Sequence, residues 1–393
     1  MTKLEQLIKE LCPNGVEILE IGEFAKVEKG KNKDKKCNLA YSITKGGLVP
    51  TVEYFKDAKV TSDDTSGYRI VRKNWFVYSP SRIDVGSINY LRDDIEIIVS
   101  PLNVVFSIDE RRILPSYLLY FLGSRSGTWQ ILISREGIEG TGRKLLPFDK
   151  FAKIKVPVPP IEIQIEIVKS LDIFSEYISK LEAELTARKK QYEYYRDLLL
   201  DFGVHGGGTS DFAWKTLGDV SAISSGGDVP KDNWSKTKTS KHTIPIFSNG
   251  IDDKGLYGYT NIAKIDKPAI TIAGRGAGVG NSFLRNEPYY PIVRLISLIP
   301  KSIVNVRYLY YCVQCIEFKV PKSGIPQLTV PMVSEYKIPV PPIDEQERIV
   351  SILDRFDKLC NDISEGLPAE IEARRKQYEY YRDKLLSFEE VRT

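Results

Sequence analysis

A ten-residue stretch recurs almost unchanged in this chain and constrains its fold more than any other feature. The segment RKKQYEYYRD at 188–197 returns as RRKQYEYYRD at 374–383. Longer segments precede both copies, since KVPVPPIEIQIEIVKSLDIF at 155–174 matches KIPVPPIDEQERIVSILDRF at 337–356. Matching stretches in the same order indicate a tandem duplication. The sequence therefore predicts two similar halves, each ending in the same kind of element.

Each repeat is predicted to lead into a long helix through an extended stretch. Pro-x-Pro-Pro at 157–160 and 339–342 cannot be helical throughout, because proline lacks an amide hydrogen and restricts the residue before it. Apolar residues then recur every three or four positions, as in a coiled-coil seam. We expect helices of about 40 residues, roughly 60 Å long. The seam contains Leu171, Phe174, Ile178, Leu181, Leu185, Tyr192 and Tyr195 in the first copy and Leu353, Phe356, Ile363, Tyr378 and Tyr381 in the second.

The two copies differ in length by four residues. The leading segments match at an offset of 182 residues (337 minus 155), whereas the QYEYYRD segments match at 186 (374 minus 188). Gly366 and Pro368 fall within the longer region. Because a four-residue insertion interrupts a heptad pattern, we expect the second helix to be kinked or broken there.

The regions before the two helices also resemble each other, more faintly and in the same order. SRIDVG at 81–86 aligns loosely with GRGAGVG at 274–280, and SYLLYFL at 116–122 aligns with RYLYYCV at 307–313. Their short apolar runs, interrupted by Gly, Pro, Asn and Asp, predict mixed β structure with a few helices. The predicted order is an N-terminal helix at 1–13, a globule at 14–155, a long helix at 156–202, a second globule at 203–336 and a second long helix at 337–393.

Positive charge is concentrated in the two globules. The net charge of the chain is only +4, but residues 14–155 hold 23 basic and 18 acidic residues, and residues 203–336 hold 15 and 10, so each globule carries +5. A shared excess of positive charge favours a polyanion as ligand, because phosphate neutralisation dominates nucleic-acid affinity. The candidate DNA-binding residues lie in predicted loops and are Arg69, Arg72, Lys73, Arg82, Arg143, Lys144, Lys231, Lys236, Lys238, Lys241, Arg275, Lys322 and Gln327.

The sequence contains few residues and motifs of the kinds that catalyse reactions. Two histidines are present, and no GxxxxGK[ST] phosphate loop occurs. GRGAGVGNS at 274–282 departs from the dinucleotide fingerprint, because Asn281 replaces its third glycine. Cys312 and Cys315 form a CxxC within a segment typical of a buried helix, so we interpret them as core cysteines and expect no metal site. The sequence favours a protein that recognises a ligand over one that catalyses a reaction.

The composition also indicates the cellular compartment of the protein. No apolar run approaches the roughly 20 residues that a membrane span needs, and the first eleven residues have the spacing of an amphipathic helix. Five cysteines, an odd number, do not form a disulfide framework. We therefore expect a cytoplasmic protein.

Taken together, these features resemble the specificity (S) subunit of type I restriction-modification enzymes. The resemblance rests on the paired VPVPPIEIQ and IPVPPIDEQERIV segments, on both QYEYYRD segments and on the opening KLEQLIKELCPNGVEI. It implies an α+β fold, in which two pseudo-twofold-related mixed α/β target-recognition domains are separated by two long antiparallel coiled-coil helices. Each domain then recognises one half of a bipartite DNA target.

The resemblance further implies a set of partners. The helices set the spacing of the half-sites, and the seam residues above hold the two helices together and dock two modification (methyltransferase) subunits, which restriction (translocase and endonuclease) subunits join. The chain itself is then non-catalytic and holds no cofactor, since S-adenosylmethionine, ATP and Mg belong to the partner subunits.

Two alternatives remain open from the residues alone. A fused methyltransferase-nuclease needs a cofactor loop and an acidic metal cluster, neither of which we find in the sequence. A non-catalytic scaffold that joins two β-rich binding domains through a coiled coil explains the repeats, but it leaves the matched charge of the globules unexplained. DNA binding that weakens with salt distinguishes the scaffold from the specificity subunit.

Overall fold

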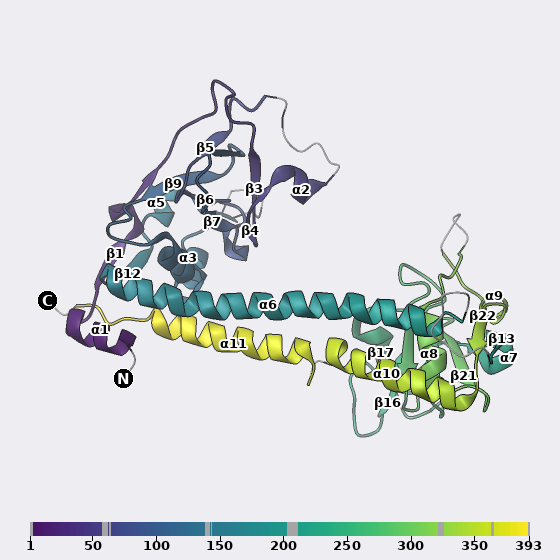
Figure 1. Cartoon of the computed structure of the whole chain (residues 1–393). Helices are drawn as coiled ribbons and strands as arrows, with labels where there is room; N and C mark the ends of the chain where they lie inside the picture. Colours follow the sequence, from purple (N-terminus) through teal and green to yellow (C-terminus); the bar gives the residue numbers. More distant parts are fainter. Residues whose placement is uncertain are drawn as a thin grey trace. The chain divides into compact units, whose positions relative to one another are not determined.

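The computed structural model describes residues 3–56, 62, 64–137, 142, 144–202, 211–320, 326–362 and 365–391. The chain divides into two compact units (Figure 1). Unit 1 contains Met1–Leu181 and Ile371–Thr393, and unit 2 contains Glu182–Glu370. The helix α6 (Ile161–Leu200) begins in unit 1 and ends in unit 2. Each unit holds a globule of sheets and short helices beside a part of α6.

In the described residues, the globule of unit 1 is built from two four-stranded sheets and two two-stranded ribbons, β1–β12 and β10–β11. The sheets have the strand orders β2-β9-β6-β7 and β4-β3-β8-β5, and β3 runs parallel to β8. Its strands are β1 (Glu17–Glu20), β2 (Ala25–Val27), β3 (Ala40–Thr44), β4 (Gly47–Pro50), β5 (Arg69–Val71), β6 (Phe76–Tyr78), β7 (Ile88–Tyr90), β8 (Ile97–Val99), β9 (Val104–Ile108), β10 (Glu136–Gly137), β11 (Lys144–Leu145) and β12 (Lys155–Val158).

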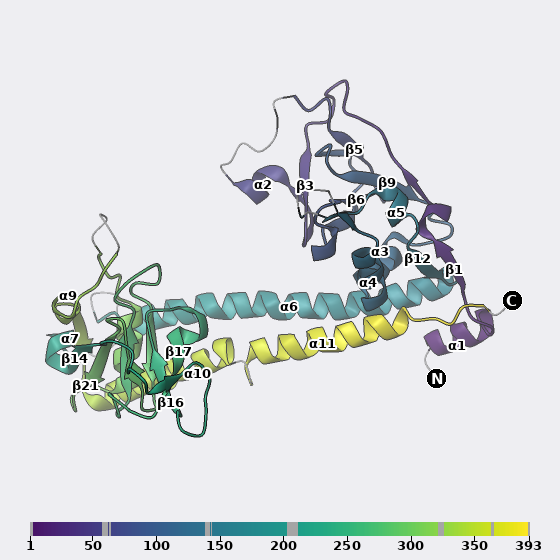
Figure 2. The same cartoon turned by 180° about the vertical axis from the view of Figure 1, so that it is seen from behind.

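Short helices connect these strands to the long helices. Figure 2 shows α3 and α4 beneath the sheets and next to α6. In α3 the first residue is Pro115, which has no amide hydrogen to leave unpaired at a helix start. The helical segments of the unit are α1 (Lys3–Leu11), η1 (Ile21–Glu23), α2 (Thr51–Phe55), η2 (Ile83–Val85), α3 (Pro115–Gly123), α4 (Arg125–Ile133), α5 (Phe148–Phe151) and part of α11 (Leu367–Leu385).

In unit 1 the long helices α6 and α11 lie side by side and antiparallel. The rings of Phe174 and Tyr381 stack with centroids 5.4 Å apart, and the Arg374 guanidinium lies 5.4 Å from the centroid of the Tyr177 ring. Later residues of α6 therefore contact earlier residues of α11. Leu171 is fully buried in the core that continues into the globule.

The two ends of the chain meet in unit 1. The Val16 amide donates to the carbonyl of Glu389 (2.9 Å), and the Val391 amide donates to the carbonyl of Val16 (3.2 Å). Gly15 has φ +105°, and a side chain there would lie 2.6 Å from the Glu389 carbonyl oxygen. The contact therefore requires glycine.

The globule of unit 2 repeats the architecture of unit 1. Its sheets have the orders β14-β21-β18-β19 and β15-β17-β16-β20, and β16 runs parallel to β20. The ribbon β13–β22 corresponds to the ribbon β1–β12. The strands are β13 (Ala213–Thr216), β14 (Ser221–Ser225), β15 (Trp234–Ser235), β16 (Ile244–Phe247), β17 (Leu256–Thr260), β18 (Ala269–Ile272), β19 (Ser282–Arg285), β20 (Tyr290–Pro291), β21 (Ile296–Pro300) and β22 (Lys337–Val340).

The helices of unit 2 pack on the C-terminal part of α6. Figure 1 shows α10 running alongside it, and the rings of Tyr195 and Phe356 stack with centroids 5.6 Å apart. Asn305 caps α8, because its side-chain oxygen accepts from two backbone amides of the first turn. The helical segments are α7 (Leu217–Val220), η3 (Asp252–Gly255), α8 (Val306–Gln314), α9 (Val330–Ser334) and α10 (Ile343–Asn361).

The duplicated α+β fold predicted from the sequence is confirmed. The second repeated segment is divided into α10 and α11, and Asp362 after α10 is extended, with φ −72° and ψ 115°. One prediction about the core is wrong: Cys312 is buried, but Cys315 is exposed, because α8 ends at the residue before it. Among the described residues, no helix is long and apolar enough to span a membrane, and no three His, Cys, Asp or Glu side chains form a metal site.

Candidate nucleic-acid interface

One loop has the same length and the same closing hydrogen bond in both globules. In unit 1 it covers residues 79–87 between β6 and β7, and in unit 2 it covers 273–281 between β18 and β19. The Ser79 amide donates to the carbonyl of Ser87 (3.0 Å), just as the Ala273 amide donates to the carbonyl of Asn281 (2.8 Å). Near the end of each loop is a glycine with positive φ, +86° in the first and +90° in the second. We call these segments the reading loops.

A distant segment joins each reading loop. The Leu146 amide donates to the carbonyl of Pro80 (3.0 Å), and the Leu328 amide donates to the carbonyl of Gly274 (2.8 Å). Two pairs of the predicted DNA-binding residues are thereby brought together. Arg82 lines one cavity with Lys144, and Arg275 forms a β-bridge with Gln327.

The hydrogen bonds fix the register between the two loops. Pro80 takes the place of Gly274, so Arg275 corresponds to Ser81, and Arg82 corresponds to Gly276. Arg82 and Arg275 are therefore not at the equivalent positions that the sequence alignment predicts. They lie one position apart in the two loops.

The reading loop of unit 1 borders a basic cavity of about 480 Å³. Arg135 forms its wall, with Nη1 bound to Asp84 (2.5 Å) and Nη2 bound to the carbonyl of Lys144 (3.0 Å). Its side chain is only 11% exposed, so these contacts are shielded from water. Arg82 and Lys144 are exposed and form no ion pair with a described residue, which leaves two cations on a fixed support. The cavity is lined by Ser81, Arg82, Arg135, Gly142 and Lys144.

A second cavity, of about 400 Å³, also has Arg82 in its lining, together with Lys45 and several hydroxyl and amide side chains. Hydroxyl and amide side chains both donate and accept hydrogen bonds, as base edges in the major groove require. These residues were not predicted from the sequence, because they come from segments that are separate along the chain: β3 with the residue after it, α2, and the turn after β8. The parallel pairing of β3 with β8 brings the first and the last of these together. The residues are Tyr41, Ser42, Thr44, Lys45, Tyr54, Ser100 and Asn103.

The reading loop of unit 2 is supported by Asn249. Its Oδ1 accepts from the Gly274 amide (2.9 Å), and its Nδ2 donates to the carbonyl of Val293 (2.5 Å). Arg275 is exposed, whereas Gln327 is half-buried. The sequence gives no local signal for Asn249, because both of its partners are distant along the chain.

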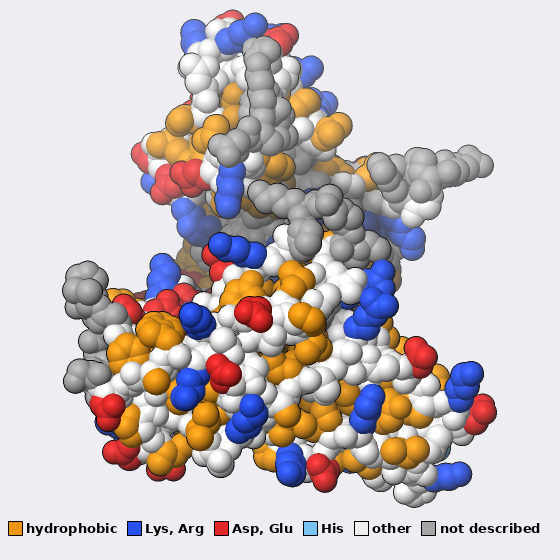
Figure 3. Space-filling model, turned by 90° about the vertical axis from the view of Figure 1, so that its right-hand side faces the viewer, with side chains coloured by type: hydrophobic (Ala, Val, Ile, Leu, Met, Phe, Trp, Pro, Cys, Tyr) orange, Lys and Arg blue, Asp and Glu red, His pale blue; other side chains and the backbone are white. Residues whose placement is uncertain are grey.

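The remaining predicted cations of unit 2 lie in the segment around β15. Trp234 in this segment packs against Tyr257, with ring centroids 5.2 Å apart. Figure 3 shows that basic side chains on the visible face of unit 2 are spread singly among uncharged and acidic ones. These cations, all of them exposed, are Lys231, Lys236, Lys238 and Lys241.

The predicted basic cluster at β5 is separate from the reading loop. Arg69 Nε donates to the carbonyl of Pro101 (3.3 Å), beside Ser100 of the polar cavity. Arg72 is engaged by Glu96, with Nε and Oε2 3.0 Å apart, and Lys73 is exposed in the following turn. None of the three basic residues lines either cavity of the reading loop. Arg143 and Lys322 lie outside the described residues.

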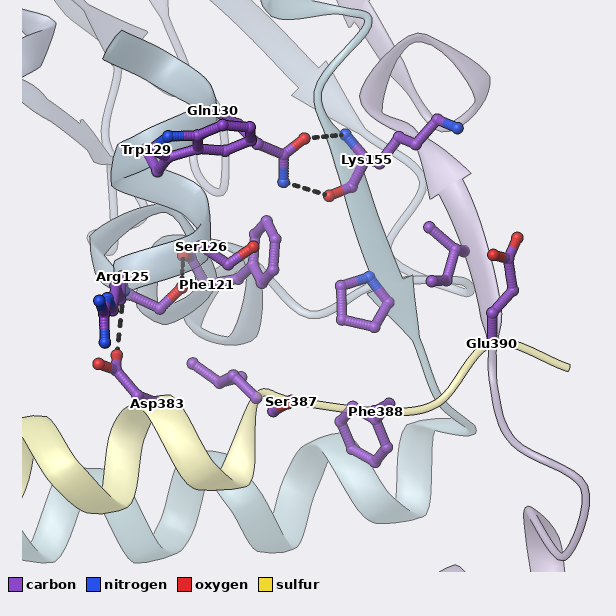
Figure 4. A pocket seen from close by; sticks show the side chains of 14 residues that line it. Phe121, Arg125, Ser126, Trp129, Gln130, Lys155, Asp383, Ser387, Phe388 and Glu390 are labelled. Carbon is purple, nitrogen blue, oxygen red and sulfur yellow. Dashed lines mark hydrogen bonds between the residues drawn. The ribbon is translucent and has the colours of Figure 1, made fainter. Parts of the chain in front are cut away.

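A different cavity, of about 620 Å³, lies beside the second QYEYYRD copy in unit 1 (Figure 4). Its walls come from α4, β12 and the C-terminal segment. The Arg125 amide donates to Asp383 (3.0 Å), and the Gln130 side chain binds both backbone groups of Lys155. Trp129 is exposed at its rim. The cavity contains none of the predicted DNA-binding residues.

The fold and the matched loops define a protein with two repeated recognition domains on a shared helical support. The family described as the type I restriction modification DNA specificity domain matches residues 13–188 and again 209–373. The chain therefore belongs to this family.

Individual relatives agree with this assignment. A putative type I specificity subunit of Mycoplasma pneumoniae is 35% identical over 257 residues, which cover 62% of this chain and 75% of that protein. The specificity subunit of a type I restriction enzyme of Escherichia coli is 32% identical over 320 residues, covering 75% and 76%.

Solved structures share the fold. The S subunit of a type I system from M. genitalium has a TM-score of 0.57 at 16% identity and covers 94% of this chain and 96% of that chain. A chain solved in work on the assembly and conformational transition of a type I restriction-modification system has a TM-score of 0.64 at 19% identity, covering 95% and 98%.

Proposed function

We propose that this chain is the sequence-specific DNA-binding subunit of a type I restriction-modification complex, and that each globule recognises one half of a bipartite target. The observation that carries the proposal is the pair of reading loops. Each has an exposed arginine next to a side chain from a distant segment, Lys144 in unit 1 and Gln327 in unit 2. Arginine suits guanine edges and phosphates, and amides suit adenine edges.

In this proposal the chain recognises DNA and catalyses nothing. S-adenosylmethionine, ATP and Mg are held by partner subunits, so the methyl transfer and the cleavage take place there. The complex works in the cytoplasm. What supports a recognition role is the nature of the two cavities beside Arg82, since one is basic and the other combines Arg82 and Lys45 with hydroxyl and amide groups.

The salt dependence of DNA binding tests the proposal. The chain, purified with its methyltransferase partners, is titrated into fluorescent duplex DNA between 50 and 300 mM salt, about the range in which counterion release is measurable. Each neutralised phosphate contributes about −0.9 to the slope of log K against log salt, so a slope steeper than about −4 is expected. No binding at low salt would favour the alternative of a protein scaffold.

We further propose that two modification subunits dock on the two QYEYYRD copies. Most of the seam residues predicted from the sequence face inward. The buried ones are Leu171, Leu181, Tyr192 and Leu353, and the half-buried ones are Phe174, Ile178, Leu185, Phe356, Tyr378 and Tyr381. Tyr195 is 37% exposed, and Ile363 lies outside the described residues. A docking partner therefore needs other residues.

Tyr194 and Tyr380 are the residues that we propose for docking. They are 63% and 61% exposed at equivalent positions of the repeat. Each packs edge-on against the following tyrosine, with ring centroids 5.4 Å apart in both copies. Exposed tyrosines of fixed orientation are frequent anchors of protein interfaces. The same surface occurs once in each unit, so the chain offers two equivalent sites for one kind of partner.

Native mass spectrometry of the reconstituted complex tests these sites. Tyr194→Ala and Tyr380→Ala are each expected to lower the occupancy of one modification subunit, and the double variant to lose both. Ile133→Ala, at an exposed apolar residue of α4, is the control and should keep two copies. Full occupancy in the double variant contradicts docking at these tyrosines.

A further inference from the structure

A buried glutamine joins the globule of unit 1 to α6. Gln164 is fully buried, and all hydrogen-bonding groups of its amide are used. Its Oε1 accepts from the Leu114 amide (2.8 Å), just before α3. Its Nε2 donates to the carbonyls of Arg112 (2.9 Å) and Pro159 (2.8 Å). One planar group therefore ties the segment before α3 to the segment before α6.

The same arrangement recurs in unit 2. Gln346 is also fully buried, and its Oε1 accepts from the Asn305 amide (2.8 Å), just before α8. Its Nε2 donates to the carbonyls of Ile303 (3.1 Å) and Pro341 (2.8 Å). All three bonds are at equivalent positions. We call each set of contacts a joint.

Tyrosines from the globule complete each joint. The Tyr117 hydroxyl donates to the carbonyl of Pro157 (2.9 Å), and the Tyr308 hydroxyl donates to the carbonyl of Pro339 (3.0 Å). One helical turn later, Tyr120 bonds Asp172 and Tyr311 bonds Asp354. The joint of unit 2 has an additional ion pair between Arg307 and Asp354 (2.9 Å).

These bonds restrict orientation in a way that apolar contacts do not. Apolar surfaces attract without direction, whereas hydrogen bonds weaken steeply as their geometry departs from linearity. A buried amide with three directed bonds defines both a position and a plane. Breaking one of the bonds would leave a buried backbone group unpaired, so alternative angles are disfavoured.

We propose that Gln164 and Gln346 are positioning residues, which fix the angle of each globule on its long helix and thereby the number of base pairs between the two half-sites. This inference rests on the proposed function. Successive base pairs are about 3.4 Å apart, so even a small tilt of a globule moves its reading loop by one base pair. A chain with loose joints would still recognise both half-sites, but at several spacings.

The test maps methylated adenines left by the reconstituted complex on a random-sequence DNA library. Gln164→Met and Gln346→Met replace the amide with an apolar side chain of similar length. Ile165→Met and Glu347→Met change the adjacent exposed positions and serve as matched controls. We expect both half-site sequences to persist in the glutamine variants, and the preference for the native gap over gaps one base pair longer or shorter to fall about tenfold. The controls should keep the native gap.

The outcomes separate this inference from the proposed function. A wild-type chain that yields no split target overturns the proposed function and the inference together. A split target with an unchanged gap preference in both glutamine variants overturns the inference alone, even if total methylation falls. If the glutamine variants do not fold, Tyr117→Phe and Tyr308→Phe remove one hydroxyl from each joint. A broader gap distribution in them supports the inference, and an unchanged one contradicts it.

Discussion

At the scale of single residues, our proposal assigns a central part in DNA recognition by unit 1 to Arg82. It lines both the basic and the polar cavity, and it projects from a reading loop whose ends are hydrogen-bonded to each other. Arg135 lies behind it with its charge offset by Asp84 (2.5 Å). The exposed arginine is thus available to a DNA edge.

Replacement of Arg82 should weaken recognition of one half-site only. We expect Arg82→Ala to lower specific affinity by about 1–3 kcal/mol and to relax the sequence preference at one or two base pairs of that half. Competition binding with duplexes changed in one half-site at a time measures this. Arg111→Ala, which removes an exposed arginine paired with Asp109, is the control. An equal loss for every DNA sequence would assign Arg82 to phosphate contact alone.

The buried tyrosines of the joints predict sensitivity to alkali. Burial raises the pKa of Tyr117 and Tyr308 above the ordinary value of 10. Above pH 10 the unfolded chain loses these protons while the folded chain keeps them, so the free energy of unfolding falls as pH rises.

Each such tyrosine contributes a slope of about 1.4 kcal/mol per pH unit. Thermal unfolding of wild type and of Tyr308→Phe between pH 9 and 11.5 checks this, because the variant should lose stability less steeply. An identical slope in both proteins contradicts it.

At the scale of elements, the break between α10 and α11 requires a glycine. A Cβ at Gly366 would lie 2.7 Å from the carbonyl oxygens of both Lys358 and Asp362. These are backbone atoms, so the last turn of α10 would have to move. We expect Gly366→Ala to destabilise unit 2 by about 1–3 kcal/mol.

Thermal unfolding measures this cost, which corresponds to a fall in Tm of about 2–4 °C per kcal/mol for a unit of this size. The control is Gly227→Ala in the same unit, where the nearest atom to an added Cβ is Lys264 Nζ at 3.9 Å. If the two alanine variants unfold at the same temperature, the break does not depend on Gly366.

The elements visible from the sequence are those with local signals. The duplicated helices follow from repetition and apolar spacing, and the break follows from the four added residues and Gly366. The sequence predicts Arg82 and Lys144 separately as DNA-binding residues. That they line one cavity could not be predicted, because the hydrogen bond between Leu146 and Pro80 joins segments that are distant along the chain.

The hydrogen bonds of the joints could not be predicted from the sequence, for a related reason. Gln164 follows Pro-Pro-Ile-Glu-Ile and looks like an ordinary helix residue, because all three of its partners are backbone groups. Nearly every residue type has the same backbone groups, so a contact with the backbone produces no recognisable sequence pattern. The matched position of Gln346 was the available signal, and it becomes informative only when both globules are known to pack on their helices in the same way.

At the scale of the whole molecule, the duplication gives the chain two of each functional part. It has two reading loops, two joints and two copies of QYEYYRD with an exposed tyrosine, one of each in each unit. We expect the target of such a chain to be asymmetric, because its two reading loops carry different side chains on a similar framework.

The central claim is that each globule recognises its own half of a split DNA target. The measurement is to reconstitute the chain with its modification subunits, map methylated adenines on a random-sequence library, and repeat this after exchanging residues 203–336 for the corresponding globule of a relative. We predict a split target with a fixed gap, of which the exchange alters one half and leaves the other half and the gap unchanged. Methylation at one continuous site, or an exchange that alters both halves, would contradict the account.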